Sequence, residues 1–160
     1  MNAEQRILQE RENWRKDRPF GFVAKPVMKK DKSLDLFMWE CTIPGPELSP
    51  FNGCNLGLII EFYTSYPASP PQVKFTSNIY HPNVYSDGFV CLDILSDAWT
   101  PSMNIKTILM AVHTLLGEPN NDSPANEEAA ELYRKNPRKY MQKAIKCLSA
   151  PKQTRSKPAQ

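Results

Sequence analysis

The chain has 160 residues and a hydrophobic content of 41%, which fits one ordinary domain with its own core. No apolar run approaches the roughly 20 residues that a membrane-spanning helix needs, and the mixed-charge N-terminus lacks the apolar segment of a secretory signal. We therefore expect a reducing compartment in which the four cysteines are free thiols. We expect a location in the nucleus and cytoplasm and no membrane partner.

The formal net charge of +3 hides an uneven distribution. Residues 1–40 hold nine Lys/Arg and seven Asp/Glu. Residues 41–133 hold two Lys/Arg and ten Asp/Glu, and residues 134–160 hold nine Lys/Arg and no Asp or Glu. Charge asymmetry between segments indicates partner surfaces. The basic end could bind nucleic acid, but its charges alternate with an apolar helical stripe. A solvated helix and tail are the simpler interpretation.

The N-terminal part of the chain predicts one helix followed by four strands. An amphipathic helix is expected over residues 3–16, with one partly apolar stripe made by Ile7, Leu8, Arg11, Trp14 and Arg15. Short segments rich in Val, Ile and Phe follow at 20–27, 34–43, 56–62 and 72–75, separated by turn residues. Consecutive strands with short links, including the hairpin loop MKKDKS, favour an antiparallel meander.

The second half of the chain predicts a long loop and three helices. Residues 66–99 fit no helical period, and such a segment is usually functional. Asn104 caps a helix whose inward face is Ile105, Ile108, Leu109, Val112, Leu115 and Leu116. Ser123-Pro124 predicts the N-cap and first residue of a helix that runs through Tyr133.

Asn136-Pro137 repeats that signature and starts the last helix, whose predicted inward residues are Tyr140, Met141, Ala144, Ile145 and Leu148. The order of helix, strands, loop and helices indicates an α+β fold. We expect a single domain over residues 1–150 and a flexible basic tail over residues 151–160.

The four thiols differ in their sequence context. Cys41 lies in a strand pattern and Cys147 in the last helix, where a free cysteine behaves as a small hydrophobe, and Cys54 lies in a turn. Cys91 follows the long irregular segment, at the edge of a loop. Spacing alone leaves its reactivity open, because reactivity depends on the surroundings of the thiol.

Several kinds of site are not expected. The chain has no Cys-x-x-Cys, and its two histidines, His81 and His113, are not at ligand spacing, so we expect no metal. It has no Gly-rich phosphate loop, so we expect no nucleotide cofactor. Neither histidine is placed diagnostically for a Cys–His protease.

Five motifs resemble, in order and in spacing, those of the ubiquitin-conjugating enzymes, from about residue 5 to about residue 148. They are Tyr66-Pro67-x-x-Pro70-Pro71, His81-Pro82-Asn83-Val84-Tyr85, Gly88-x-Val90-Cys91-Leu92-Asp93-Ile94-Leu95, Trp99-Thr100-Pro101 and Glu118-Pro119-Asn120-x-x-Ser123-Pro124-Ala125. The resemblance implies the fold of that family and a conjugating-enzyme catalytic domain over residues 1–150. It also makes Cys91 the expected nucleophile.

In this family the cysteine, here Cys91, receives ubiquitin or a ubiquitin-like protein from an activating enzyme as a thioester. It then passes the modifier to a lysine amine, usually with a ligase. A thiolate is a good nucleophile and a good leaving group, so it divides one acyl transfer into two. The resemblance assigns Asn83 to stabilise the tetrahedral oxyanion, directly or through the loop it orders. It implies that His81 organises the loop and is not a base.

Further residues match positions around the cysteine. Tyr85 and Ser123 match residues that contact the incoming lysine. Many members carry Asp at the Ser123 position, where it is thought to desolvate or deprotonate the lysine, and serine cannot act as that base at neutral pH. We hypothesise that Asp87 or the backbone supplies this activation. Tyr63 and Pro101 match the surface that faces the ligase.

The two halves of the chain favour different modifiers. The first 45 residues resemble SUMO-conjugating enzymes, including the stretches from Trp14 to Pro26 and from Trp39 to Gly45. In those enzymes a basic patch binds the modifier, and its positions are matched by Arg11, Arg15 and Arg18. Arginines spaced in this way can present one cationic face.

The catalytic half resembles the ubiquitin enzymes instead. The segment from Leu95 to Trp99 is short, where SUMO enzymes carry an acidic insertion, and Gln72 stands where a second lysine is common. We favour SUMO, with ubiquitin as the alternative.

The expected partners are SUMO or ubiquitin, an activating enzyme, ligases and substrate proteins with acceptor lysines. No cofactor is expected, because ATP is used by the activating enzyme and not by this chain. A non-catalytic scaffold and a nucleic-acid-binding module remain as alternatives of another class, and the presence of Cys91 argues against the scaffold.

Overall fold

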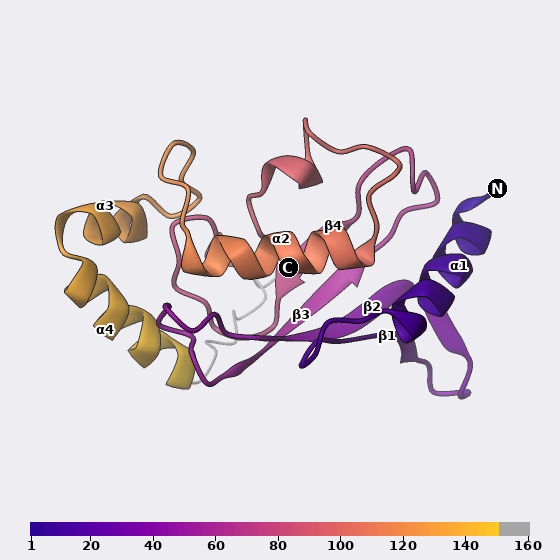
Figure 1. Ribbon diagram of the computed structural model, residues 1–160, viewed down its shortest axis with the longest axis horizontal. Coiled ribbons are helices and arrows are strands. Elements are labelled where there is room, and N and C mark those ends of the chain that lie inside the picture. The colour runs from indigo at the N-terminus through magenta and orange to yellow at the C-terminus, as the bar shows by residue number, and fades with distance from the viewer. Residues whose placement is uncertain (151–160) are drawn as a thin grey trace, which may run out of the picture.

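A computed structural model describes residues 1–150, and the predicted tail over residues 151–160 lies outside the described residues (Figure 1). Nine elements follow in chain order: α1 (Ala3–Lys16), β1 (Val23–Met28), β2 (Leu34–Pro44), β3 (Asn55–Glu61), β4 (Gln72–Phe75), the short 3-10 helix η1 (Asp93–Leu95), α2 (Ile105–Gly117), α3 (Glu127–Lys135) and α4 (Pro137–Ser149). The α+β class expected from the sequence is confirmed.

The four strands form one antiparallel sheet in the order β1-β2-β3-β4, the predicted meander. Buried residues alternate along β3, and its Ile60 pairs with Trp39 on β2 and with Val73 on β4. Because side chains of a strand alternate between faces, these three residues lie on the same side of the sheet. That side is buried, and α2 runs across the sheet in Figure 1.

The helix α2 has the inward face that its periodicity predicts. All six expected residues are buried: Ile105, Ile108, Leu109, Val112, Leu115 and Leu116. The Asn104 side chain accepts a hydrogen bond from the backbone N–H of Thr107, as an N-cap does. The predicted first strand begins later than expected, at Val23, because Phe20 is fully exposed and Gly21 has a positive φ of 85°.

The predicted stripe of α1 is only partly correct. Ile7 and Trp14 are buried, but Leu8 is exposed and Glu10 takes an inward position, only 4% exposed. A buried carboxylate is tolerated only where hydrogen bonds and charges compensate its lost hydration. Helical periodicity could not identify this residue, since two of its three hydrogen-bond partners, Tyr66 and Ile105, are far away in the chain.

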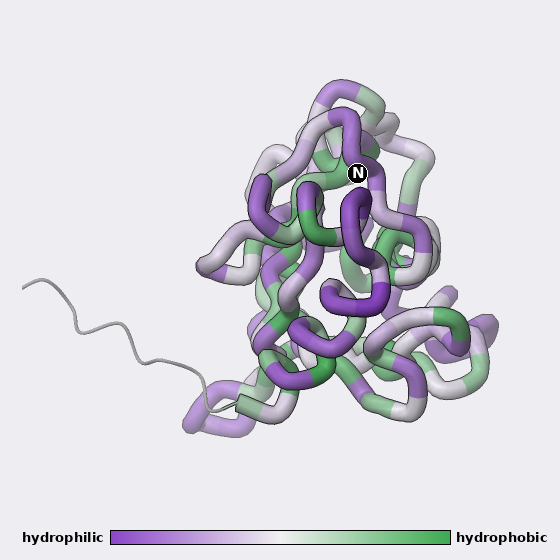
Figure 2. The backbone as a smooth tube through the Cα atoms, turned by 90° about the vertical axis from the view of Figure 1, so that its left-hand side faces the viewer, coloured by the Kyte–Doolittle hydropathy of each residue, from purple (hydrophilic) through white to green (hydrophobic). Residues whose placement is uncertain are grey.

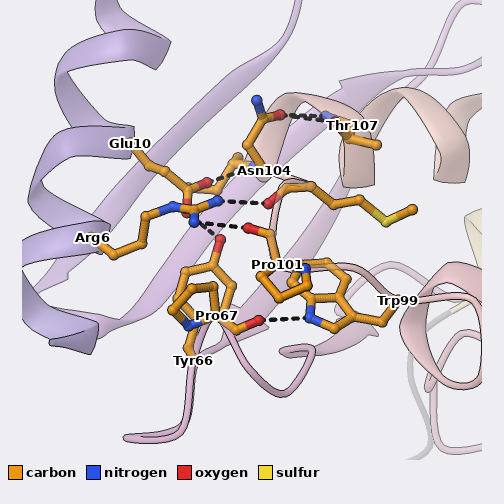
Figure 3. Close-up of polar contacts among 10 residues, drawn as sticks. Arg6, Glu10, Tyr66, Pro67, Trp99, Pro101, Asn104 and Thr107 are labelled. Atoms are coloured by element: carbon orange, nitrogen blue, oxygen red, sulfur yellow. Dashed lines mark hydrogen bonds and ion pairs between the residues drawn. The ribbon is translucent and has the colours of Figure 1, made fainter. Parts of the chain in front are cut away.

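Those partners form a polar cluster beneath α1, shown in Figure 3. The Glu10 carboxylate accepts hydrogen bonds from the Tyr66 hydroxyl, from the Arg6 Nε at 3.1 Å and from the Ile105 backbone N–H at 2.8 Å. Burial raises the pKa of the Glu10 carboxyl, and these three partners oppose that rise. The cluster therefore connects α1 to the start of α2 and to the Tyr66 loop.

Arg6 extends the same cluster to a third segment. Its two terminal nitrogens donate to the backbone carbonyls of Pro101 and Met103, each at 2.8 Å. The Trp99 indole N–H donates to the Pro67 carbonyl at 2.8 Å, and its ring lies 5.9 Å from that of Tyr66. The segments around Tyr66 and Trp99 are thus held side by side against α1 (Figure 3).

The C-terminal helices correct two predictions. The helix α3 begins at Glu127 with Asn126 as its N-cap, so Ser123 is not the cap that the Ser-Pro signature indicated. On α4, Tyr140 and Ala144 are buried, but Met141 and Ile145 are 42% and 50% exposed. Asn136 and Pro137 begin α4 as predicted.

Hydrophobic and hydrophilic stretches are intermingled along the coloured part of the tube in Figure 2, which fits amphipathic elements that share one core. Within residues 1–150, no helix has the length and apolar character needed to cross a membrane.

Candidate active site

Cys91 is positioned by a hairpin that covers the free edge of the sheet. The strand β4 is an edge strand, and edge strands carry unpaired backbone groups that must be satisfied. The segment from Gly88 to Val90 provides the partners: the Phe75 N–H donates to the Gly88 carbonyl at 2.8 Å, and the Val90 N–H donates to the Val73 carbonyl at 3.1 Å. Cys91 comes directly after this pairing and is half-buried.

Gly88 is required at the tip of this hairpin. Its φ is 99°, and a Cβ at this position would lie 2.6 Å from the Phe75 carbonyl oxygen. A side chain would therefore combine an unfavourable backbone conformation with a clash against β4. The glycine lets the loop approach the sheet edge closely, which fixes the start of the Cys91 segment.

His81 lies beneath the hairpin and is completely buried. Its Nδ1 accepts from the Asn83 backbone N–H at 2.9 Å, so Nε2 carries the proton that is donated to the Leu115 carbonyl at 2.8 Å. Burial lowers the pKa of the imidazole to about 4, which keeps it neutral at physiological pH. Both ring nitrogens of His81 are thus engaged with backbone groups, one in the Asn83 segment and one on α2.

Asn83 joins the two loops that surround Cys91. Its side-chain amide donates to the Asn120 carbonyl at 2.6 Å, and its amide oxygen accepts from the Asn120 N–H at 2.8 Å. Its own carbonyl accepts from the Cys91 N–H at 2.8 Å. The residue is only 2% exposed. One side chain therefore fixes the backbone of the 118–126 loop relative to Cys91.

The neighbouring residue adds to this connection. The Pro82 carbonyl accepts hydrogen bonds from the N–H groups of Ala125 and Asn126, at 2.8 and 3.0 Å. The Cys91 Sγ lies 3.9 Å from the Ser123 carbonyl oxygen. These bonds attach the segment before α3 to the loop that carries Asn83, and the extended Asn126 then caps α3 at Glu127.

Other expected site residues surround this centre at different distances along the hairpin. The Tyr85 N–H donates to the carbonyl of Phe89, which lies two residues before Cys91. The Tyr85 side chain is 47% exposed. Asp87 lies at the exposed tip, where its carboxylate accepts from the Phe89 N–H at 3.3 Å. Ser123 is exposed on the facing loop.

Sequence reasoning missed two residues of the facing loop. The backbone of Asn120 holds the Asn83 amide, and Asp122 is an exposed carboxylate next to Ser123. The Asn120 side chain accepts from the Asp122 N–H at 3.0 Å. The signal for Asp122 was its place beside Ser123, and nothing in the sequence identified the partner of Asn83.

The structure also places the five outer residues. Tyr63 and Pro101 are both exposed, and Pro101 lies in the segment whose backbone Arg6 binds (Figure 3). Arg15 and Arg18 are exposed and Arg11 is half-buried, all on or just after α1. No salt bridge among residues 1–150 involves these three arginines.

The other thiols have different surroundings. Burial raises the pKa of the Cys41 thiol to about 12, so it is an inert packing residue, as predicted. Cys54 and Cys147 are half-buried. In the described part of the chain, no cluster of His, Cys, Asp and Glu could hold a metal ion.

This arrangement supports acyl transfer. It offers a half-buried sulfur between two loops that hydrogen bonds hold together, and such a thiol can act as a nucleophile. The Ser123 carbonyl lies beside the sulfur, and Asn83 holds the backbone of both surrounding loops.

Comparisons with known proteins agree with this geometry. The family model described as ubiquitin-conjugating enzyme matches residues 6–148. The Sumo-conjugating enzyme ubc9 of Dictyostelium discoideum is 43% identical over 140 residues, which cover 86% of this chain and 88% of the relative. The SUMO-conjugating enzyme UBC9 of Caenorhabditis elegans is 42% identical over 143 residues, which cover 88% and 86%.

Proposed function

The chain belongs to the ubiquitin-conjugating enzyme family, and on that premise we propose that it carries SUMO as a thioester on Cys91 and transfers it to lysines of substrate proteins. Similarity to two SUMO-conjugating enzymes along most of both chains carries the choice of modifier. The accessible thiol between the two fixed loops supports the choice of nucleophile.

The transfer needs two acyl steps at the same sulfur. In loading, the Cys91 thiolate attacks the modifier's carbonyl carbon held on the activating enzyme, and that enzyme's thiolate leaves. In discharge, a lysine amine attacks the thioester carbon, an oxyanion forms, the C–S bond breaks and the amine proton passes to solvent or a carboxylate. This chain needs no cofactor for either step in our proposal, because the activating enzyme consumes the ATP.

We assign Asn83 to hold the loops around that oxyanion. In the observed geometry its amide N–H is already bonded to the Asn120 carbonyl, which supports a loop-ordering role. A direct contact with the oxyanion would require that bond to be exchanged. Tyr85 and Ser123 flank the path along which a lysine would approach.

Ser123 cannot act as a base that activates the lysine at neutral pH, so another group is required if the amine is activated by this chain. We propose Asp87, on the hairpin tip, with Asp122 as the competing candidate because it lies beside the Ser123 carbonyl that contacts the thiol. Asp87→Ala should slow discharge to free lysine at least tenfold and leave loading unchanged, with Asp122→Ala as its matched comparison. If Asp122→Ala slows discharge and Asp87→Ala does not, Asp87 has no role in activating the lysine and the proposal for it is wrong.

The docking surfaces that we propose lie on residues outside the Cys91 site. We assign Arg11, Arg15 and Arg18 to bind the modifier or the activating enzyme, since they carry charges that no described carboxylate neutralises. Tyr63 and Pro101 are assigned to the ligase side, because both are exposed on neighbouring segments.

A loading assay tests the function. The purified chain is mixed with ATP and either SUMO with its activating enzyme or ubiquitin with its own, and the products are separated with and without thiol. We expect a thiol-sensitive adduct with SUMO. An adduct that forms with ubiquitin and not with SUMO would overturn the proposal that SUMO is the modifier. The short segment between η1 and Trp99, where SUMO enzymes carry an insertion, is the observation that favours this alternative.

A further inference from the structure

A lysine-rimmed groove on the two C-terminal helices is left without a role by the proposed function. It has a volume of about 570 Å³ and is formed by residues of α3 and α4 and by the residue after α4: Leu132, Lys139, Gln142, Lys143, Lys146, Cys147 and Ala150. We propose that this groove binds an acidic amphipathic helix of a partner protein, at a site separate from Cys91.

The floor of the groove is apolar. Leu132 and Cys147 are half-buried, and the Cys147 carbonyl is fixed by a hydrogen bond of 2.8 Å from the Asn78 side chain. The aliphatic stems of the lysines extend the apolar area beside them, as lysine stems do. Leucine-sized side chains of a partner could therefore be buried between α3 and α4.

The rim is positively charged on an acid-free part of the chain. Between residues 134 and 150 there are six Lys/Arg and no Asp or Glu. The Lys143 ammonium is already paired with Glu128 of α3, which also accepts from the Tyr80 hydroxyl at 2.9 Å. No salt bridge of residues 1–150 uses Lys139 or Lys146, so these two charges are available to a partner.

The positions of these two lysines define the partner. They are seven residues apart on one helix, so at 1.5 Å per residue they are separated by roughly 10 Å along α4. Two carboxylates separated by two turns of a helix that runs beside α4 would meet both ammonium groups. Apolar residues on the facing side of that helix would enter the groove, as in other helix-in-groove complexes.

The segment of this chain that follows α4 is not the expected occupant of the groove, because its charge has the same sign as the rim. The segment that follows Ala150, residues 151–160, contains three Lys/Arg and no acidic residue, so its charge repels the rim. Nucleic acid would satisfy the lysines but would leave the apolar floor exposed to water. The combination of floor and rim is therefore specific to an acidic partner with apolar anchors.

The groove lies far from the other proposed docking surface. In Figure 1, α4 and α1 occupy opposite ends of the long axis of the molecule. A partner on α4 would leave the arginines of α1 accessible, so both surfaces can be occupied at once.

A binding experiment with a defined probe tests this proposal. The probe is a fluorescent helical peptide of roughly 15 residues, the length at which an isolated helix becomes marginally stable. It carries leucines on one face and glutamates on both sides of that face. A poly-aspartate peptide and a DNA duplex of equal charge serve as competitors. We expect the leucine peptide to bind with a dissociation constant in the micromolar range and neither competitor to displace it efficiently.

Matched variants locate the binding site. Lys139→Glu with Lys146→Glu should weaken binding at least tenfold, whereas Lys29→Glu with Lys30→Glu, the same charge change in the exposed β1–β2 loop, should change it less than twofold. The peptide should also slow alkylation of Cys147, which lines the groove, and not that of Cys54, which does not.

The proposal is overturned if the two double variants bind equally, if Cys147 is not protected, or if DNA or poly-aspartate displaces the probe as well as unlabelled peptide does. Loading of Cys91 is measured on the same samples and should be unchanged in both double variants. A failure of loading in the unaltered protein would affect the proposed function alone.

Discussion

At the scale of single residues, Asn83 has the most demanding position in the site. Both polar atoms of its amide are bonded to the backbone of Asn120, and its own carbonyl holds the Cys91 N–H. A buried residue that satisfies three backbone groups cannot be replaced without leaving some of them unpaired. Loss of its amide therefore releases the loop beside the thiol.

We predict that Asn83→Ala lowers the free energy of unfolding by about 2 kcal/mol and slows discharge about 100-fold, with loading less affected. Asn120→Ala is the control, because it removes one exposed side-chain bond and keeps the backbone groups that pair with Asn83. Its discharge rate should stay within about twofold of the original. Equal losses in both variants would show that Asn83 has no special function.

His81 makes stability depend on pH. The pKa of its imidazole is about 4 in the folded chain, below its usual 6.5. Between these values the unfolded chain binds a proton that the folded chain does not, so stability is lost as pH falls from about 6.5 to about 4. An imidazolium would also direct an Nδ1–H toward the Asn83 N–H that Nδ1 now accepts.

His81→Gln should remove this dependence, since an amide can make both hydrogen bonds and does not titrate. Between about pH 7 and about pH 4.5, the unaltered chain should lose about 2–3 kcal/mol more than the variant, as measured by urea unfolding. Parallel pH profiles for the two proteins would contradict the account.

The residue scale also shows what sequence can reveal. Cys91 and His81 lie in contiguous motifs that the resemblance identified, and both ring nitrogens of His81 bond to backbone groups, which fits the structural role expected for it. Glu10 was hidden, because its burial is compensated by Tyr66 and by Ile105, which lies 95 residues away. Local patterns do not contain such long-range compensation.

At the scale of elements, the start of α3 shows which of two possible N-cap residues, Ser123 or Asn126, begins the helix. Ser123-Pro124 has the signature of a helix start, but Asn126 makes the capping bond to the Ala129 N–H. The N–H groups of Ala125 and Asn126 donate to the Pro82 carbonyl, and the backbone of Asn126 is extended with a φ of −128°. Tertiary contacts decided between two acceptable caps, and sequence alone could not weigh them.

We predict that Asn126→Ala lowers the free energy of unfolding by about 1 kcal/mol, the usual effect of a lost N-cap. Ser123→Ala should change it by less than about 0.5 kcal/mol. Chemical denaturation of the two variants provides the measurement. A larger loss of unfolding free energy for Ser123→Ala than for Asn126→Ala would show that Ser123 is the N-cap after all.

Regular elements with one continuous buried face were predicted well, whereas α4 was not. The six inward residues of α2 are buried in the core that the helix shares with the sheet. On α4, only Tyr140 and Ala144 are buried, and Met141 and Ile145 remain exposed. Figure 1 shows α4 at one end of the molecule, where few neighbours cover it, and apolar periodicity does not reveal how much of a helix is covered.

At the scale of the whole molecule, the charge segments correspond to different surfaces. The arginines of α1 lie at one end and the lysines of α4 at the other, and the acidic residues of 41–133 include those around Cys91. A near-neutral total is thus the sum of two basic ends and an acidic middle. This separation fits a carrier that binds several proteins in turn.

We predict that exchanging Arg11, Arg15 and Arg18 for glutamate slows SUMO loading at least tenfold at low salt and less at high salt, because screening weakens the unaltered interaction. Lys29→Glu with Lys30→Glu is the control for a general charge effect. Equal loading rates for the arginine variant and the control would contradict a docking function for α1.

The most direct test of the central claim is the chemistry of the bond at residue 91. The account predicts a SUMO adduct on the unaltered chain that thiol reagents remove, and an adduct on Cys91→Ser that resists thiol but is cleaved by alkali, as an oxygen ester is. Mass spectrometry of the intact protein can distinguish the two. A thiol-sensitive adduct that persists in Cys91→Ser would contradict the account, because the acyl group would then be carried by another cysteine.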